Sequence, residues 1–416
     1  MESYEIDTPV IIAGAGPAGA TTSLFLCKEN IPHVIIDRAS FPRDKICGDA
    51  LSGKVVNVLQ RLDENILEDV YKDASKFLGS YGVKFGAPNG QTVDVPFKKN
   101  ISSLTNAPGF LSKRIDFDHF LFQKIDRKVA TVIENCSLKN IQYEKDGIRC
   151  VAEQYNKTIN LFSKLIIGAE GDRSVVAKQL SFLRKENAHY CAGLRAYYTG
   201  VKNMHEQSFI ELHFIKELLP GYLWVFPLPD GAANVGVGML SSQVSKRKIN
   251  LKQVMLDALK FNPVLKNRFD KAELAGAIKG WGLPLGTKKR KISGKRFMLA
   301  GDAAFLIDPF TGEGIGNAMT SGMIAAAQVK RAVNEDKYDA KFLRAYDEEV
   351  YRVLWSELKI SRTLQRFSKY PKLFNYVVSK ANTNEDFRDT ITCMFDDLDL
   401  RKKLSNPRLY FKLLFR

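Results

Sequence analysis

A glycine-rich turn near the start of the chain limits the folds that this sequence can adopt. The apolar stretch Val10–Ala13 predicts a short strand that runs directly into Gly14, Gly16 and Gly19, in the spacing GxGxxG. In a β-α-β unit the first glycine permits a tight turn, the second lets the backbone approach a pyrophosphate, and the third lets the helix pack on the strand. We expect that helix to start at Pro17 and to present its free N–H groups and positive end to the pyrophosphate.

An acidic residue follows the second predicted strand, His33–Ile36. Asp37 stands 18 residues after Gly19, where a carboxylate accepts hydrogen bonds from the ribose hydroxyls of an adenosine. A GxGxxG pattern alone is also found in ordinary turns. The strand before it, the helix after it and the acid at the expected spacing together favour a dinucleotide-binding unit.

A second glycine-rich segment far downstream indicates which dinucleotide is bound. Phe297–Ala300 predicts a strand, Asp302 follows it, and the alternate glycines of Gly312–Gly316 open a helix expected to reach about residue 333. NAD does not need a second cradle, whereas FAD does, because its ribityl chain and flavin extend away from the adenine. We expect Asp302 to accept a hydrogen bond from a ribityl hydroxyl. The amides near Gly314 and Ile315 would face the flavin, where a helix N-terminus stabilises negative charge.

These segments resemble the FAD-binding segments of the p-hydroxybenzoate hydroxylase-like flavoproteins. Within that superfamily the chain is most similar to the geranylgeranyl reductase family, through Cys47–Ser52 (CGDALS), Tyr222–Pro227 (YLWVFP) and Asn234–Gly238 (NVGVG). The resemblance spans roughly residues 4–365. It implies an enzyme, an FAD-dependent oxidoreductase that reduces carbon–carbon double bonds of a geranylgeranyl or related isoprenoid lipid. Hydride would pass from NAD(P)H through flavin N5.

The resemblance also implies roles for individual residues. The loop around Cys47 lies against the flavin in the family, and an arginine matching Arg114 contacts FAD. Cys47 has two interpretations, a small packing residue beside the flavin, which we favour, and a catalytic thiol. Glu170 replaces the aspartate of a family GADGxxS motif, which leaves the partner of this acid open. The expected cofactor-binding residues are Gly14, Gly16, Ala18, Gly19, Asp37, Arg38, Cys47, Gly48, Ala50, Arg114, Asp302, Gly312, Gly314 and Ile315.

Three aromatic residues alternate along one predicted strand. Tyr222, Trp224 and Phe226 are two positions apart, so their side chains face the same side of a sheet. Aromatic residues on one face usually belong to a core. Because the resembled family places its lipid pocket at this motif, we favour a substrate-binding wall of an apolar tunnel.

The length of 416 residues predicts more than one lobe. We expect an α/β fold with a doubly wound, Rossmann-like FAD-binding domain (1–75, 105–180 and 285–335). An antiparallel β-sheet substrate domain (76–104 and 181–284) and a C-terminal helical region (336–416) complete it. Pro88–Gly90 predicts a hairpin turn, and a helix is expected to begin at Leu111. With one GxGxxG, NAD(P)H has no Rossmann domain of its own and must visit the flavin transiently.

The chain is strongly basic, with 62 Lys and Arg against 46 Asp and Glu, a net charge of +16. This favours an anionic partner, and because no nucleic-acid motif accompanies it, we expect no nucleic acid. A lipid substrate or an anionic membrane surface is the partner that fits the family resemblance. No apolar run reaches the roughly 20 residues of a membrane span, and the acidic start lacks a signal peptide. We therefore expect a cytoplasmic protein. The apolar-basic segment Leu409–Phe415 either docks on the substrate lobe or contacts a membrane surface.

Scattered cysteines without metal-ligand spacing predict no metal site. The alternative function is a flavin-dependent monooxygenase that hydroxylates an aromatic or lipid substrate, since the same fold serves both chemistries. A halogenase is less favoured, because the chain has YxWxFP where halogenases show WxWxIP. The oligomeric state, the precise lipid and the electron donor stay open at this level.

Overall fold

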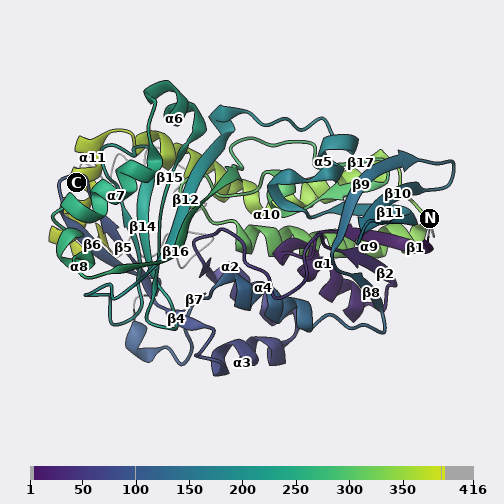
Figure 1. Ribbon diagram of the computed structural model, residues 1–416, viewed down its shortest axis with the longest axis horizontal. Coiled ribbons are helices and arrows are strands. Elements are labelled where there is room, and N and C mark those ends of the chain that lie inside the picture. Colours follow the sequence, from purple (N-terminus) through teal and green to yellow (C-terminus); the bar gives the residue numbers. More distant parts are fainter. Residues whose placement is uncertain (1–3, 99, 386, 389–416) are drawn as a thin grey trace.

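The computed structural model describes residues 4–98, 100–385 and 387–388. Two large β-sheets lie side by side along the long axis of the molecule, with helices packed around them (Figure 1). This is the mixed α/β architecture that the sequence predicts. The segment Leu409–Phe415, for which two positions were expected, lies outside the described residues.

The first sheet has eight strands around a parallel centre in the order β18-β11-β1-β2-β8. Antiparallel strands β10 and β9 extend from β11, and β17 pairs with β18. Strand β2 is buried along its whole length, as expected of a parallel strand covered on both faces. The strands are β1 (Tyr4–Ala13), β2 (His33–Ile36), β8 (Ala130–Ile133), β9 (Cys136–Tyr143), β10 (Ile148–Gln154), β11 (Lys157–Gly168), β17 (Ser293–Gly294) and β18 (Phe297–Leu299).

Two helices that are about 300 residues apart in the sequence cross closely beside this sheet, α1 (Pro17–Lys28) and α9 (Ile315–Glu335). The hydroxyl of Thr22 donates to the carbonyl oxygen of Gly322 at 3.2 Å. A Cβ on Gly322 would lie 2.4 Å from the carbonyl oxygen of Ala18, so only glycine permits this approach. The crossing brings the two glycine-rich turns, which precede these helices, to the same edge of the sheet.

The second sheet has seven strands in the order β16-β12-β15-β14-β13-β5-β6, antiparallel except for the pair β13 and β5. The expected hairpin turn at Pro88–Gly90 joins β5 and β6, and Gly90 has a φ of +86°. The strands are β5 (Gly82–Gly86), β6 (Thr92–Pro96), β12 (Tyr190–Thr199), β13 (Ile210–His213), β14 (Tyr222–Pro227), β15 (Ala233–Leu240) and β16 (Glu273–Pro284). The connection from β15 to β16 contains three helices, α6 (Ser241–Arg247), α7 (Leu251–Phe261) and α8 (Lys266–Phe269).

A small sheet carries the loop that was expected at the flavin. Its strands are β3 (Ala50–Leu51), β7 (Gly109–Leu111) and β4 (Leu78–Ser80). The helix expected from Leu111 was placed too early, because Leu111 ends β7, which pairs with both neighbours, and helix α4 runs over Arg114–Gln123. Three further helices are α2 (Gly53–Leu62), α3 (Glu64–Lys72) and α5 (Val175–Leu180).

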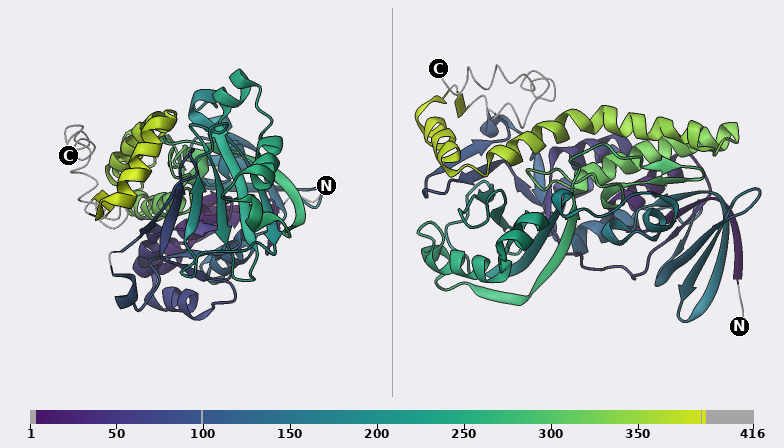
Figure 2. Two further views of the ribbon diagram at one scale, coloured as in Figure 1. Left: turned by 90° about the vertical axis from the view of Figure 1, so that its left-hand side faces the viewer. Right: turned by 90° about the horizontal axis from the view of Figure 1, so that it is seen from above.

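The C-terminal helices tie the two large sheets together. Helix α10 (Ala340–Phe367) runs along one side of the molecule past both of them, and α11 (Pro371–Thr383) follows beside β6 (Figure 2). The side-chain amide of Gln365 near the end of α10 donates to the carbonyl oxygen of Pro309 at 2.6 Å. None of the helices in the described part of the chain combines the length and the apolar character needed to cross a membrane.

Candidate functional site

A single large cavity of about 1860 Å³ extends from the glycine turns of the first sheet to the second sheet and the C-terminal helices. Sixteen of the seventeen residues predicted to bind cofactor or substrate border it. The exception is Gly19, where a Cβ would lie 1.7 Å from the carbonyl oxygen of Gly14. Gly19 therefore serves the packing of helix on strand rather than the cavity wall.

The turn after β1 forms one end of the cavity. Gly14 has a φ of +94°, and a Cβ there would lie 2.5 Å from the carbonyl oxygen of Ala169. Gly16 and Ala18 also border the cavity, at the start of α1. The turn thus places bare backbone and a helix N-terminus against the cavity, an arrangement that binds anions.

Asp37 lies at the end of β2, largely buried beside this turn. Its Oδ2 accepts from the amide of Ala15 at 2.8 Å, and its Oδ1 accepts from the amide of Ala39 at 2.9 Å. The adjacent Arg38 also borders the cavity. A carboxylate offers about four acceptor positions, so these two bonds fix its orientation and leave acceptor capacity for a ligand hydroxyl.

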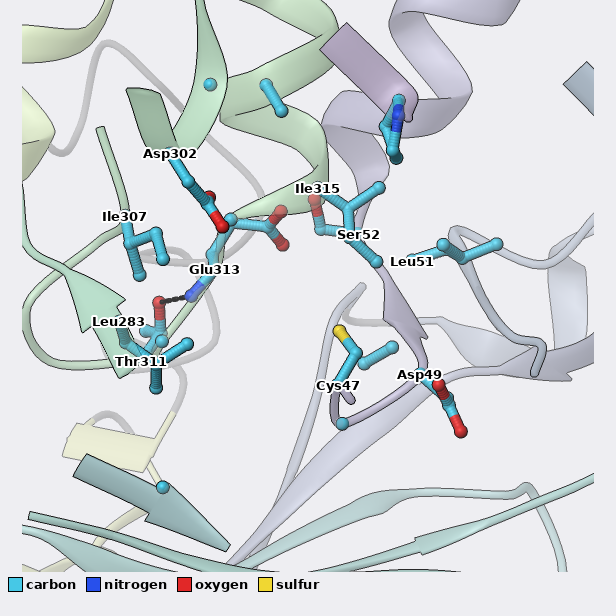
Figure 3. A pocket seen from close by; sticks show the side chains of 18 of the residues that line it. Cys47, Asp49, Leu51, Ser52, Leu283, Asp302, Ile307, Thr311, Glu313 and Ile315 are labelled. Carbon is cyan, nitrogen blue, oxygen red and sulfur yellow. Dashed lines mark hydrogen bonds between the residues drawn. The ribbon is translucent and has the colours of Figure 1, made fainter. Parts of the chain in front are cut away.

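The second predicted cradle lies around the start of α9 (Figure 3). Asp302 is in a 3₁₀ turn directly after β18, and its Oδ2 lies 3.4 Å from the ammonium of Lys45. Gly312 has a φ of +74°, and Gly314 and Ile315 form the N-terminal boundary of the helix. This end of the cavity therefore combines a carboxylate, a cation and a second helix N-terminus.

The loop from Cys47 to Ala50 lines the same cavity and faces the second cradle near Glu313 and Ile315 (Figure 3). A Cβ on Gly48 would lie 3.0 Å from the ring of Phe226, so the loop backbone packs tightly on the second sheet. Arg114 is buried beside Cys47, and its guanidinium donates to both carboxylate oxygens of Asp118 at 2.6 and 2.7 Å. Burial alone would lower the pKa of Arg114, but Asp118 raises it, so the group stays charged.

The partner of Glu170, which the sequence left open, is the start of helix α5. Its carboxylate accepts from the hydroxyl of Ser174 at 2.5 Å and from the amide of Val175 at 2.9 Å. Burial raises the pKa of Glu170, and these hydrogen bonds oppose the rise. Glu170 therefore fixes the backbone that packs against Gly14.

Strand β14 forms an aromatic wall on the other side of the cavity. Tyr222, Trp224 and Phe226 lie on its same face, with neighbouring ring centroids 6.4 and 6.3 Å apart. The indole of Trp224 donates to the side-chain oxygen of Asn234 at 2.8 Å, and the hydroxyl of Tyr222 donates to the carbonyl of Thr311 at 2.6 Å. The polar atoms of the wall are thus paired, and its ring faces are left for apolar contact.

Sequence reasoning missed most of the apolar lining beyond this wall. Most of it comes from β5, β6, β13 and the C-terminal helices, none of which carries a motif, and two further residues come from the loop before α9. The apolar periodicity of α10 and α11 predicts a buried face, but not what that face covers. The lining residues are Val83, Phe85, Val93, Ile210, Leu212, Ile307, Phe310, Ile360, Leu364, Phe367, Leu373, Phe374, Val377, Val378, Ala381 and Phe387.

The residues present fit FAD. One continuous cavity is bordered by all the features that FAD needs. They are the bare backbone at Gly14 and Gly16, the oriented carboxylate of Asp37, and the second cradle at Asp302 and Gly314. Its volume exceeds that of typical ligand pockets, so an extended dinucleotide and a second ligand can be accommodated together. Within the described ranges, no group of His, Cys, Asp and Glu side chains is arranged to hold a metal ion.

Comparisons with known proteins agree with this geometry. A family model described as an FAD binding domain matches residues 7–361. The chain is 26% identical over 375 residues to the digeranylgeranylglycerophospholipid reductase of Methanococcus vannielii, covering 88% of this chain and 89% of that protein. It is 27% identical over 326 residues to the menaquinone reductase of Mycolicibacterium smegmatis, covering 76% and 75%.

A solved structure with the same fold is that of a geranylgeranyl bacteriochlorophyll reductase-like protein from Thermoplasma acidophilum. The TM-score is 0.79 at 21% identity, and the match covers 96% of this chain and 99% of that one. At this identity the likeness establishes the fold alone.

Proposed function

Because the chain belongs to the family defined by this FAD binding domain, we propose that it is an FAD-dependent oxidoreductase that reduces carbon–carbon double bonds of a geranylgeranyl or related isoprenoid lipid. One observation carries the proposal. A single cavity joins the two glycine-rich cradles to a long wall of aromatic and aliphatic side chains. A redox cofactor bound at the cradles and an apolar substrate chain bound along this wall would therefore be in contact inside the same cavity.

We assign the cofactor to the two cradles and the loop between them. Asp37 and Arg38 would hold the adenosine end, the start of α1 the pyrophosphate, and Asp302 with the start of α9 the ribityl chain and flavin. Arg114 would keep a fixed positive charge beside the Cys47 loop. When bound, FAD supplies hydride transfer at N5, and the proposed donor of that hydride is NAD(P)H. The division into FAD-binding segments, substrate segments and a C-terminal helical region belongs to the same proposal.

The apolar part of the cavity would hold the isoprenoid. Trp224 and Phe226 stand nearest the Cys47 loop, and α11 lines the far part with Phe374 and Val377. Branched aliphatic chains bind such walls by burial of apolar area, which stabilises by about 25 cal/mol per Å². A lipid substrate and the charge of +16 support a position against an anionic membrane surface on the cytoplasmic side.

The proposal is tested by anaerobic turnover. Purified yellow protein is incubated without oxygen with NAD(P)H and a geranylgeranyl lipid, and lipid masses are followed. We expect gains of two hydrogen atoms per double bond reduced. A monooxygenase would consume no substrate until oxygen is admitted and would then add one oxygen atom, which would overturn the reductase proposal. Mass spectrometry of any lipid that copurifies identifies the substrate class independently.

The role of Cys47 is tested in the same assay. Cys47→Ser keeps the size of the side chain and removes the thiol, which is the catalytic candidate in the sequence. If the thiol acts chemically, the variant binds FAD normally and loses double-bond reduction. Full activity of this variant would restrict Cys47 to packing beside the cofactor.

A further inference from the structure

The end of α10, the whole of α11 and the turn between them carry charge of one sign (Figure 2). Residues 358–384, which we call the basic corner, contain no Asp or Glu. The part of α10 before them, residues 340–357, has four acidic residues against three basic ones. The basic corner therefore supplies +6 of the net charge of +16. Its cations are Lys359, Arg362, Arg366, Lys369, Lys372 and Lys380.

Most of these cations are not neutralised by the protein. Earlier on α10, Arg344 pairs with Glu348 at 3.0 Å. In the described part of the chain, by contrast, four exposed cations of the basic corner have no carboxylate within ion-pair distance, namely Lys359, Arg366, Lys369 and Lys372. Cations gathered on one surface without acidic partners attract an anionic partner.

Large aromatic side chains are exposed at the same corner. Phe367 is 51% exposed, Tyr370 52% and Tyr376 45%. The ammonium of Lys369 lies 4.9 Å from the centre of the Tyr370 ring, and that of Lys380 lies 5.8 Å from the centre of the Tyr376 ring. Rings and cations side by side are typical of helices at a membrane interface, where the ring lies at headgroup level and the cation meets anionic lipid.

Helix α11 has two different faces. One face borders the apolar part of the cavity with Phe374, Val377 and three further residues. Lys372, Tyr376 and Lys380 are four positions apart, so they form a row on the side of the helix away from the cavity. A wall one helix thick therefore separates the apolar cavity from a basic and aromatic outer surface.

The cavity reaches the surface beside this helix. Lys359, Thr363 and Phe367 are four positions apart on α10, and all three are exposed and border the cavity. These three residues form a rim at the apolar part of the cavity. An isoprenoid chain that crossed water to reach this rim would expose its apolar area. Contact between the rim and a bilayer avoids that exposure.

We propose that the basic corner docks on a bilayer that carries anionic headgroups, and that the isoprenoid enters the cavity from this bilayer past the rim. The inference deepens the proposed function and rests on it for the nature of the lipid. Helix α11 would lie along the headgroups, with Tyr370 and Tyr376 among them and the cations on their phosphates. Charge decides between occupants, because two copies of this surface repel each other, whereas an anionic bilayer complements it.

The first test measures binding of the yellow holoenzyme to vesicles. The protein is sedimented with vesicles of phosphatidylglycerol and phosphatidylcholine, and with phosphatidylcholine alone. We expect binding to the anionic vesicles that weakens as the salt concentration rises. The combined change Arg366→Gln, Lys369→Gln and Lys372→Gln should lower the partition coefficient by about 100-fold, because each cation near an anionic surface contributes to binding.

A matched triple variant separates the basic corner from net charge. Arg61→Gln, Lys128→Gln and Lys341→Gln together remove the same charge from exposed positions outside the basic corner. This control should bind anionic vesicles nearly as well as the wild type. Absence of wild-type binding, or equal losses in the two triple variants, would overturn the inference.

The second test locates the contact. Tyr370→Trp places a fluorescent ring in the basic corner, and Tyr143→Trp places one at a similarly exposed position on β9. After subtraction of the emission of the three native tryptophans, brominated lipid should quench the first probe and not the second. Equal quenching of both would overturn the inference. Protection of the first probe from iodide without vesicles would also overturn it, because another part of the chain or a second copy would then cover the surface.

A turnover experiment distinguishes this inference from the proposed function. The basic-corner triple variant should reduce a soluble ten-carbon analogue at the wild-type rate, because none of its three positions borders the cavity. Its anaerobic reduction of a geranylgeranyl lipid in anionic vesicles should fall about tenfold or more. Wild-type rates on the vesicle lipid would overturn entry from the bilayer. If the wild type reduces neither substrate, the proposed function fails, while vesicle binding and quenching still decide whether the basic corner docks.

Discussion

The carboxylate of Asp37 accepts a hydrogen bond from the amide of Ala15 at 2.8 Å, so the acid at the end of β2 holds the middle of the glycine turn. One residue thus fixes the turn that we propose as the pyrophosphate cradle, and its carboxylate keeps acceptor capacity for the proposed ribose hydroxyl. The two sequence features that first indicated a dinucleotide are a single structural unit.

Replacement of Asp37 by Ala should therefore weaken FAD binding more than loss of one ligand contact would. Hydrogen bonds to charged groups contribute about 1.5–3 kcal/mol, which predicts a rise in Kd of about 10- to 100-fold. Flavin fluorescence titration of the cofactor-free protein measures it. Asp63→Ala, which removes the cap of α3, should lower Tm and leave Kd unchanged. Equal effects on Kd would show that Asp37 acts only through general stability.

Gly14→Ala tests whether the turn itself must be bare. The φ of +94° costs a side-chain residue about 1–2 kcal/mol, and the new Cβ would collide with backbone at Ala169. We expect loss of bound FAD together with a large fall in Tm. Gly90→Ala is the matched control, because its φ of +86° is similar and the nearest atom lies 3.9 Å from the new Cβ. If Gly90→Ala loses as much bound FAD and Tm as Gly14→Ala, the collision at Ala169 is not the cause of the loss.

The sequence predicted those parts of the site that are encoded locally. The turn at Gly14, the acid Asp37 and the start of α9 each follow a strand or precede a helix, so spacing alone locates them. Their meeting depends on the α1–α9 crossing, for which Gly322 carries no readable motif. The hydrogen bonds around Asp49 were missed for a similar reason. The Asp49 carboxylate is hydrogen-bonded by Tyr197 and Asn234, which lie 148 and 185 residues away in the sequence. Both are on strands of the second sheet, and the pairing register of these strands decides which side chains face the Cys47 loop.

Glu211 on β13 and Arg268 on α8 form a buried ion pair that should govern acid stability. Burial favours the neutral form of Glu211, but hydrogen bonds from His213 and Arg268 outweigh it and lower its pKa to about 2. A lowered folded-state pKa gives stability that is present above the ordinary value of 4.5 and is lost as the pH falls toward 2. Thermal unfolding should therefore become steeply pH-dependent below 4.5.

Glu211→Gln should remove much of that pH dependence and destabilise the protein by about 3–5 kcal/mol, because Arg268 is left buried and unpaired. Denaturant unfolding at pH 7 and Tm profiles from pH 2 to 5 measure the two effects. Asp270→Asn breaks the half-exposed ion pair with Lys202 and serves as the control with little effect. An unchanged acid profile in Glu211→Gln would assign the acid sensitivity to other carboxyls.

The length of the substrate chain should be limited by α11, which no motif in the sequence connected to the cavity. Val377 borders the apolar end and is only partly buried, so Val377→Trp should fill space there rather than overpack the core. We expect kcat/KM for a twenty-carbon prenyl lipid to fall about tenfold or more, a loss of roughly 1.4 kcal/mol, while a ten-carbon analogue is reduced at the wild-type rate. Ser379→Trp places the same bulk two positions along the helix, away from the cavity lining, and should leave both substrates unaffected. Equal losses for short and long chains in Val377→Trp would mean that the isoprenoid does not extend to α11.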